Sequence, residues 1–123
     1  MAHVLVVDDE HQVRGMLKGL LTRAGHEVQT AEEGGAALRL LEETPVDLVI
    51  LDLLMPGMEG LETLMRIKKA HENVKVIVIS GGSRSINMDF LPASLKLGAH
   101  RALKKPFSND ALLETVNELL DGQ

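Results

Sequence analysis

The stretch VLVVDD at residues 4–9 decides the fold, because four aliphatic residues in a row run directly into two aspartates. A continuous run of Val and Leu predicts a strand that is buried on both faces of a parallel sheet. Residues 48–51 repeat this character and run into Asp52, and a shorter strand-like segment runs into Lys105. Because the carboxyl ends of parallel strands share one edge of a sheet, we expect these charged side chains to meet in one crevice.

Strand-like and helix-like patterns alternate five times along the chain. The expected strands are about residues 3–7, 27–31, 48–51, 74–79 and 101–104. Four helices are predicted from residues at helical spacing, namely Val13, Met16, Leu17, Leu20 and Leu21, then Ala37, Leu38 and Leu41, then Leu61, Leu64, Met65 and Lys68, and finally Leu112, Leu113, Val116, Leu119 and Leu120. A weaker helix is expected at residues 89–97. Ser108 is expected to cap the last helix, and Gly25, Thr44-Pro45 and Gly98 are expected to end earlier ones.

Five βα units with short connections predict an α/β fold, a doubly wound five-stranded parallel sheet with helices on both faces. The 123 residues suffice for one domain with a core, which we expect to span 1–123. We also expect no appended output domain, since the sequence stops directly after the fifth helix.

The composition argues against several classes of function. The net charge is −5, and with no Trp or Tyr and only two Phe the chain has few rings to stack on bases, so we expect no direct binding of nucleic acid. There is no apolar stretch long enough to span a bilayer, and we expect no membrane partner. With no cysteine, disulfide and thiol chemistry are excluded, and a cytoplasmic location is expected.

The predicted crevice has the parts for phosphoryl transfer. Asp8, Asp9 and Asp52 would supply oxygen ligands at high negative charge density, which suits Mg²⁺. A carboxylate beside such an ion can act as a nucleophile toward phosphorus. Lys105 could pair with the incoming phosphoryl charge, and the Ser80 hydroxyl, at the end of the fourth strand, could donate to another phosphoryl oxygen.

Four segments resemble the receiver domains of two-component response regulators. They are LVVDDE (5–10), VILDLLMPGMEGLE (49–62), VIVIS (76–80) and GAHRALKKPF (98–107). Together they span nearly the whole chain, in the order and at the spacing of that family. The resemblance implies a flavodoxin-like sheet with strand order 2-1-3-4-5, in a stand-alone, single-domain receiver.

The resemblance also implies a role for each site residue. Asp52 would accept a phosphoryl group from a phosphohistidine on a sensor histidine kinase or a histidine phosphotransfer protein, and the switched domain would bind a downstream protein effector. Asp9, Asp52 and the backbone carbonyl of Leu54 would bind Mg²⁺, with Asp8 acting through water. Ser80 would be the switching hydroxyl, and Lys105, before a cis bond to Pro106, would be the cation of the site.

Three features depart from the family pattern. Ala102 stands where an aromatic residue is usual, so we expect output through the backbone or the fourth helix, with Ser80, Gly81, Ala102 and Lys105 as the switch and output set. The glycine-rich connection at residues 81–89 is longer than usual and is a natural two-state element. Leu54 and Gly82 stand where the family tunes the lifetime of the phosphoryl group.

The same residues bear on several other functions. A phosphate shuttle in a phosphorelay, or a receiver cut from a larger regulator or hybrid kinase, stays open. A phosphatase resembling the haloacid dehalogenases would need a second acid where Leu54 stands. A flavodoxin-like cofactor binder would need a phosphate loop where Asp8-Asp9-Glu10 would repel phosphate. Lys104 and the five histidines are expected to be surface residues, and His11 is a weaker candidate for modulating water access to the acid pair.

Overall fold

Five parallel strands form one sheet in the order β2-β1-β3-β4-β5, which confirms the predicted fold class. The computed structural model describes residues 2–53, 59–81 and 91–121. The strands are β1 (His3–Val7), β2 (Glu27–Ala31), β3 (Leu48–Asp52), β4 (Lys75–Gly81) and β5 (Arg101–Lys105). The structure thus extends β3 and β5 one residue beyond the predicted ends, so Asp52 and Lys105 are the last residues of their strands.

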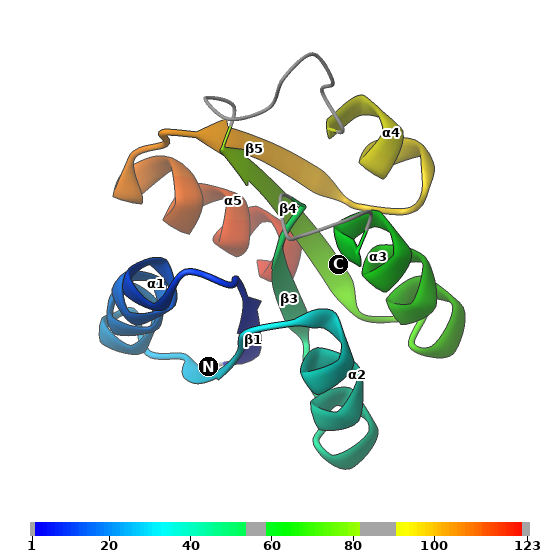
Figure 1. Cartoon of the computed structure of the whole chain (residues 1–123). Helices are drawn as coiled ribbons and strands as arrows, with labels where there is room; N and C mark the ends of the chain where they lie inside the picture. Colours follow the sequence, from blue (N-terminus) through cyan, green and yellow to red (C-terminus); the bar gives the residue numbers. More distant parts are fainter. Residues whose placement is uncertain (1, 54–58, 82–90, 122–123) are drawn as a thin grey trace.

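Helices cover both faces of this sheet (Figure 1). They are α1 (His11–Arg23), α2 (Gly34–Glu43), α3 (Glu59–Ala70), α4 (Leu91–Lys96) and α5 (Asn109–Asp121). The helices α1 and α5 pack on one face and α2 and α3 on the other, while α4 lies beside β4 and β5. Within the described part of the chain, no helix has the length and apolar character needed to cross a membrane.

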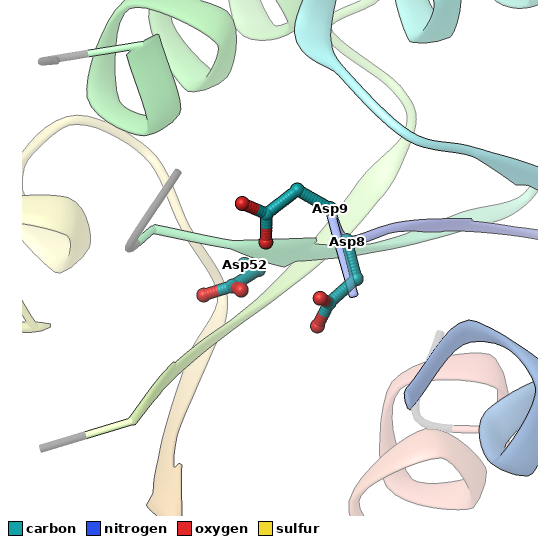
Figure 2. A group of neighbouring side chains, drawn as sticks. All are labelled: Asp8, Asp9 and Asp52. Atoms are coloured by element: carbon teal, nitrogen blue, oxygen red, sulfur yellow. The ribbon is translucent and has the colours of Figure 1, made fainter. Parts of the chain in front are cut away.

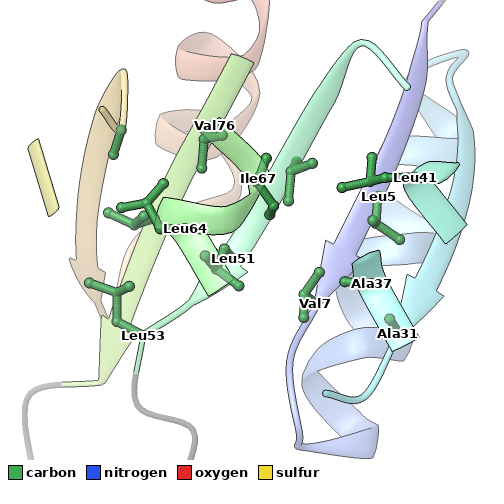
Figure 3. Close-up of a cluster of buried hydrophobic side chains, with 13 residues drawn as sticks. Leu5, Val7, Ala31, Ala37, Leu41, Leu51, Leu53, Leu64, Ile67 and Val76 are labelled. Atoms are coloured by element: carbon green, nitrogen blue, oxygen red, sulfur yellow. The ribbon is translucent and has the colours of Figure 1, made fainter. Parts of the chain in front are cut away.

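The core lies in two layers because neighbouring residues of a strand point to opposite faces. Leu5, Val49 and Leu51 point toward α2 and α3, in the cluster that Figure 3 shows. Val6 and Ile50 point the other way, toward α1 and α5. All five residues of β3 are buried, as expected of the central strand of a doubly wound sheet.

The helix predictions are correct in type but not in every detail. Met16 is 50% exposed and Met65 is 46% exposed, so placing them in the apolar stripes was wrong. In α3 the predicted Leu64 is buried, and the side chains of Thr63 and Ile67 are buried beside it. The helix α4 is described from residue 91, and the start predicted at residue 89 lies outside the described residues.

The predicted helix ends agree with the structure. The Ser108 hydroxyl oxygen accepts a hydrogen bond of 3.0 Å from the Ala111 amide, as an N-cap does. Gly25 and Gly98, which follow α1 and α4, have φ angles of +99° and +116°, which glycine adopts without strain.

The expectation that all five histidines are surface residues is wrong for three of them. His26, His71 and His100 are half-buried. The His100 Nδ1 accepts a 3.1 Å hydrogen bond from the Val76 amide, and the His26 Nδ1 accepts one of 3.3 Å from the Ala2 amide. The rings of His26 and His100 thus accept hydrogen bonds from backbone amides at the amino edge of the sheet, which is the edge away from the aspartates.

Candidate functional site

Three aspartates converge at the carboxyl edge of the sheet, as the sequence predicts (Figure 2). Asp8 and Asp9 follow β1, and Asp52 ends the neighbouring strand β3, where Val7 is the register partner of Leu51. Each aspartate offers a carboxylate oxygen, and these oxygens lie within 4.8 Å of one another. Asp8 and Asp52 are 0% and 2% exposed, whereas Asp9 is exposed to solvent.

The Asp8 carboxylate is held in place although its charge is unfavourable there. The backbone amide of Asp8 donates a 3.1 Å hydrogen bond to the Ala31 carbonyl, and the Asp8 Oδ1 accepts one of 2.9 Å from the Glu10 amide. Burial raises the pKa of Asp8 above its ordinary value, against the opposing effects of the Glu10 amide and of Lys105. A buried acid next to two other acids stores electrostatic repulsion that a bound cation would relieve.

Lys105 is the cation that reaches into this cluster. Its Nζ lies 3.4 Å from Asp8 Oδ2, 3.7 Å from Glu10 Oε1 and 3.8 Å from Asp52 Oδ2. The Lys105–Pro106 peptide bond is cis, as the resemblance implied. The neighbouring Lys104 is exposed, in agreement with the prediction that it lies outside the site.

Ser80 occupies the same edge of the sheet, one residue before the end of β4. Its side chain is buried, and its register partner on β5 is Lys104, while Asp52 is paired with Ile79 on the other side of the strand. The strand β4, which carries Ser80, therefore lies between the strand that carries Asp52 and the strand that carries Lys105.

The remaining predicted residues are only partly described. Gly81 is the register partner of Lys105, and Ala102 is a half-buried partner of Val78 that packs against the core on the α3 side. Leu54, the turn at residues 55–57 and Gly82 with the rest of the long connection lie outside the described residues.

A close backbone approach supports the segment after Asp52. Gly60, at the start of α3, lies so near Leu53 that an added Cβ would stand 2.6 Å from both the Leu53 Cα and its carbonyl oxygen. Leu53 is itself buried, and its amide donates a 2.9 Å hydrogen bond to the Ile79 carbonyl. Only glycine at position 60 lets α3 lie this close to the site.

Sequence reasoning missed Glu10 as a contact of Lys105, and it missed Arg14 altogether. The Arg14 Nη1 donates a 2.8 Å hydrogen bond to the Asp8 carbonyl oxygen. One signal was present, because Arg14 stands only three residues after the first residue of α1, near the helix end where the dipole disfavours a cation. The hydrogen bond to the Asp8 carbonyl explains why a cation is placed at this end of the helix.

The donor set fits a hard divalent cation. Mg²⁺ binds through one or two carboxylates and keeps positions for water and phosphate oxygens, and these aspartates offer that combination at one exposed and two buried positions. Among the described residues, this is the one group of histidines and acids close enough together to hold a metal ion. With Lys105 and Ser80 at the same edge, the arrangement can bind a phosphoryl group and neutralise its charge.

Comparison with known proteins agrees with this geometry. A family model described as the response regulator receiver domain matches residues 4–117. The sporulation initiation phosphotransferase F of Bacillus subtilis is 33% identical over 95% of this chain and 92% of its own length. The crystal structure of a CheY-like response regulator receiver domain protein from Methanospirillum hungatei superposes with a TM-score of 0.90 at 30% identity, covering 99% of this chain and 95% of that one.

Other relatives are much longer. The nitrogen assimilation regulatory protein NtrX of Azorhizobium caulinodans is 35% identical over 98% of this chain, but the chain spans only 27% of that protein. Sequences similar to this chain therefore occur both as short proteins and as parts of larger ones.

Proposed function

The chain belongs to the response regulator receiver domain family, and from this premise we propose that Asp52 accepts a phosphoryl group from a phosphohistidine on a sensor histidine kinase or a histidine phosphotransfer protein. The observation that carries the proposal is the placement of Asp52. The residue is 2% exposed, and its carboxylate lies within 4.8 Å of those of Asp8 and Asp9 and 3.8 Å from the Lys105 ammonium.

The chemical step is a transfer between two nucleophiles. A carboxylate oxygen of Asp52 forms a bond to phosphorus while the bond from phosphorus to the imidazole nitrogen of the donor breaks. The imidazole takes a proton from solvent and leaves neutral. Lys105 pairs with the added phosphoryl charge, and the Ser80 hydroxyl donates a hydrogen bond to a phosphoryl oxygen.

Asp8, Asp9 and Asp52 would hold Mg²⁺, together with the backbone carbonyl of Leu54. When bound, the ion supplies charge neutralisation on the phosphoryl oxygens. The donor chemistry supports this assignment, because hard carboxylate oxygens at this density suit magnesium better than softer metals.

Phosphorylation then switches a protein-binding surface. The acyl phosphate carries about −1.5 to −2 charges where the free carboxylate of Asp52 carried one, and its phosphoryl oxygens draw Ser80 and Lys105 toward them. Gly81 and Ala102 follow on the same two strands, so the change reaches α4 and a downstream protein effector. The domain is a phosphoacceptor that can also react with small donors and dephosphorylate itself, and we expect it to act in the cytoplasm.

A second candidate is a phosphate shuttle in a relay. This candidate is favoured by the similarity of the chain to a protein that is named a phosphotransferase, a similarity that covers 92% of that protein's length. A third context, a receiver within a larger regulator, is favoured by the match to a quarter of NtrX. Both contexts use the same acceptor.

The experiment is intact mass spectrometry after incubation with acetyl phosphate and Mg²⁺. One added phosphoryl mass is expected on the wild type and on Asp121→Ala, a control at an exposed aspartate. None is expected on Asp52→Ala or on the wild type in EDTA. An adduct of equal yield on Asp52→Ala would contradict the proposal, as would the lack of any adduct on folded wild type with several donors.

A further inference from the structure

We propose that Arg14 is a positioning residue, which holds the turn after β1 in the shape that lets Asp8 and Asp9 bind Mg²⁺. The proposal rests on the proposed function, because it concerns the same cation site. It starts from the hydrogen bond of 2.8 Å between the Arg14 Nη1 and the Asp8 carbonyl oxygen. That carbonyl belongs to the peptide group that joins the two aspartates.

The turn is fixed on three sides. The Asp8 amide donates to Ala31 at 3.1 Å, the Asp8 Oδ1 accepts from Glu10 at 2.9 Å, and Arg14 holds the Asp8 carbonyl. The first two bonds fix Asp8 itself. The third fixes the Asp8–Asp9 peptide, and since Asp9 is exposed, its carboxylate depends on the orientation of that peptide.

A second contact anchors the guanidinium away from the cluster. The Arg14 Nη2 lies 3.9 Å from Glu32 Oε2, directly after β2, and 3.4 Å from His11 Nδ1. The Arg14 side chain is 14% exposed, so most of it is covered by neighbouring groups. Because a guanidinium is planar and donates from several N–H groups, it can hold the Asp8 carbonyl and face Glu32 at the same time.

Charge alone would make Arg14 harmful to the site. A cation beside Asp8 and Asp9 repels Mg²⁺, so its removal would strengthen Mg²⁺ binding if its charge were all that mattered. If it positions the turn, its removal weakens Mg²⁺ binding instead. The two roles predict changes of opposite sign in one measured quantity.

The test is the Mg²⁺ dissociation constant, measured by isothermal titration calorimetry on the unphosphorylated chain. We expect Arg14→Ala to weaken Mg²⁺ binding about tenfold, the size typical of residues that orient metal ligands. Arg14→Lys keeps the charge but loses the planar guanidinium with its several N–H donors. Its Mg²⁺ dissociation constant should lie between those of Arg14→Ala and the wild type. The control is Arg39→Ala, an exposed arginine that lies 3.8 Å from Glu33 in the same way but makes no contact with Asp8.

Equal or tighter Mg²⁺ binding by Arg14→Ala would overturn the proposal. If Arg14→Ala does not fold, Arg14→Lys decides, because binding equal to that of the wild type would show that only charge matters. Lack of Mg²⁺ binding by the wild type would overturn the proposal as well. A wild type that binds Mg²⁺ but takes no phosphoryl group would refute the proposed function and leave the role of Arg14 standing.

Discussion

Replacing Lys105 by methionine isolates the electrostatics of the site. Methionine keeps much of the length of the side chain and removes the charge that lies 3.4 Å from Asp8 and 3.8 Å from Asp52. At an effective dielectric constant of about 20, each of these contacts is an attraction of about 4–5 kcal/mol before desolvation is counted. Breaking a buried ion pair from one side costs roughly 3–5 kcal/mol. Since Lys105 is 22% exposed, we expect the free energy of unfolding to fall by about 2–4 kcal/mol.

Magnesium should change this result in a defined way. The cation and the ammonium neutralise the same carboxylates, so Mg²⁺ should bind Lys105→Met more tightly and stabilise it more than it stabilises the wild type. Urea unfolding followed by far-ultraviolet circular dichroism measures both effects, because the chain has no Trp or Tyr for fluorescence. Lys104→Met, at the exposed neighbour, is the matched control and should stay within about 0.5 kcal/mol of the wild type.

Two results would refute this reasoning. If Lys105→Met unfolds at the same urea concentration as the wild type without Mg²⁺, the ammonium does not compensate the buried acids. If it is less stable but gains no more from Mg²⁺ than the wild type does, the lysine and the cation do not share those carboxylates.

Two further predictions concern the scaffold. Gly60→Ala should lower the free energy of unfolding by about 1–3 kcal/mol, because the added Cβ would stand 2.6 Å from the Leu53 backbone. Gly15→Ala, where there is open space in α1, should raise the free energy of unfolding by about 0.5–1 kcal/mol. Equal effects of the two substitutions in urea unfolding would contradict this prediction. Burial and nearby cations lower the pKa of His100, whose neutral ring accepts the hydrogen bond from the Val76 amide. The neutral ring therefore stabilises the fold at pH values above the ordinary pKa of histidine, and this stabilisation is lost as the pH falls below that value. The unfolding free energy of the wild type should therefore drop more steeply from pH 7 to pH 5 than that of His100→Gln, with His11→Gln as the exposed control, and parallel curves would argue against this role.

The sheet and the acid cluster could be predicted because their signals are local. The run before Asp8 and the run before Asp52 are continuous and aliphatic, and burial on both faces of a parallel sheet is what makes such runs stable. Parallel pairing then brings the ends of β1 and β3 to one edge without further information.

Several contacts and burial details of the fold and of the site could not be predicted in the same way. Arg14 and His100 bond to backbone groups of Asp8 and Val76, and a backbone carbonyl or amide has no sequence signature. Met16 fits an apolar stripe by spacing, yet it is 50% exposed, because helical spacing does not show how wide the buried face of a helix is.

The central claim is that the Asp52 carboxylate becomes the acyl phosphate, and borohydride reduction tests it most directly. Borohydride converts an aspartyl phosphate to homoserine, and peptide mapping by mass spectrometry then shows which aspartate was converted. After incubation with acetyl phosphate and Mg²⁺, the account predicts homoserine at position 52, with Asp8 and Asp9 unchanged. Homoserine at position 8 or 9, with Asp52 intact, would contradict it.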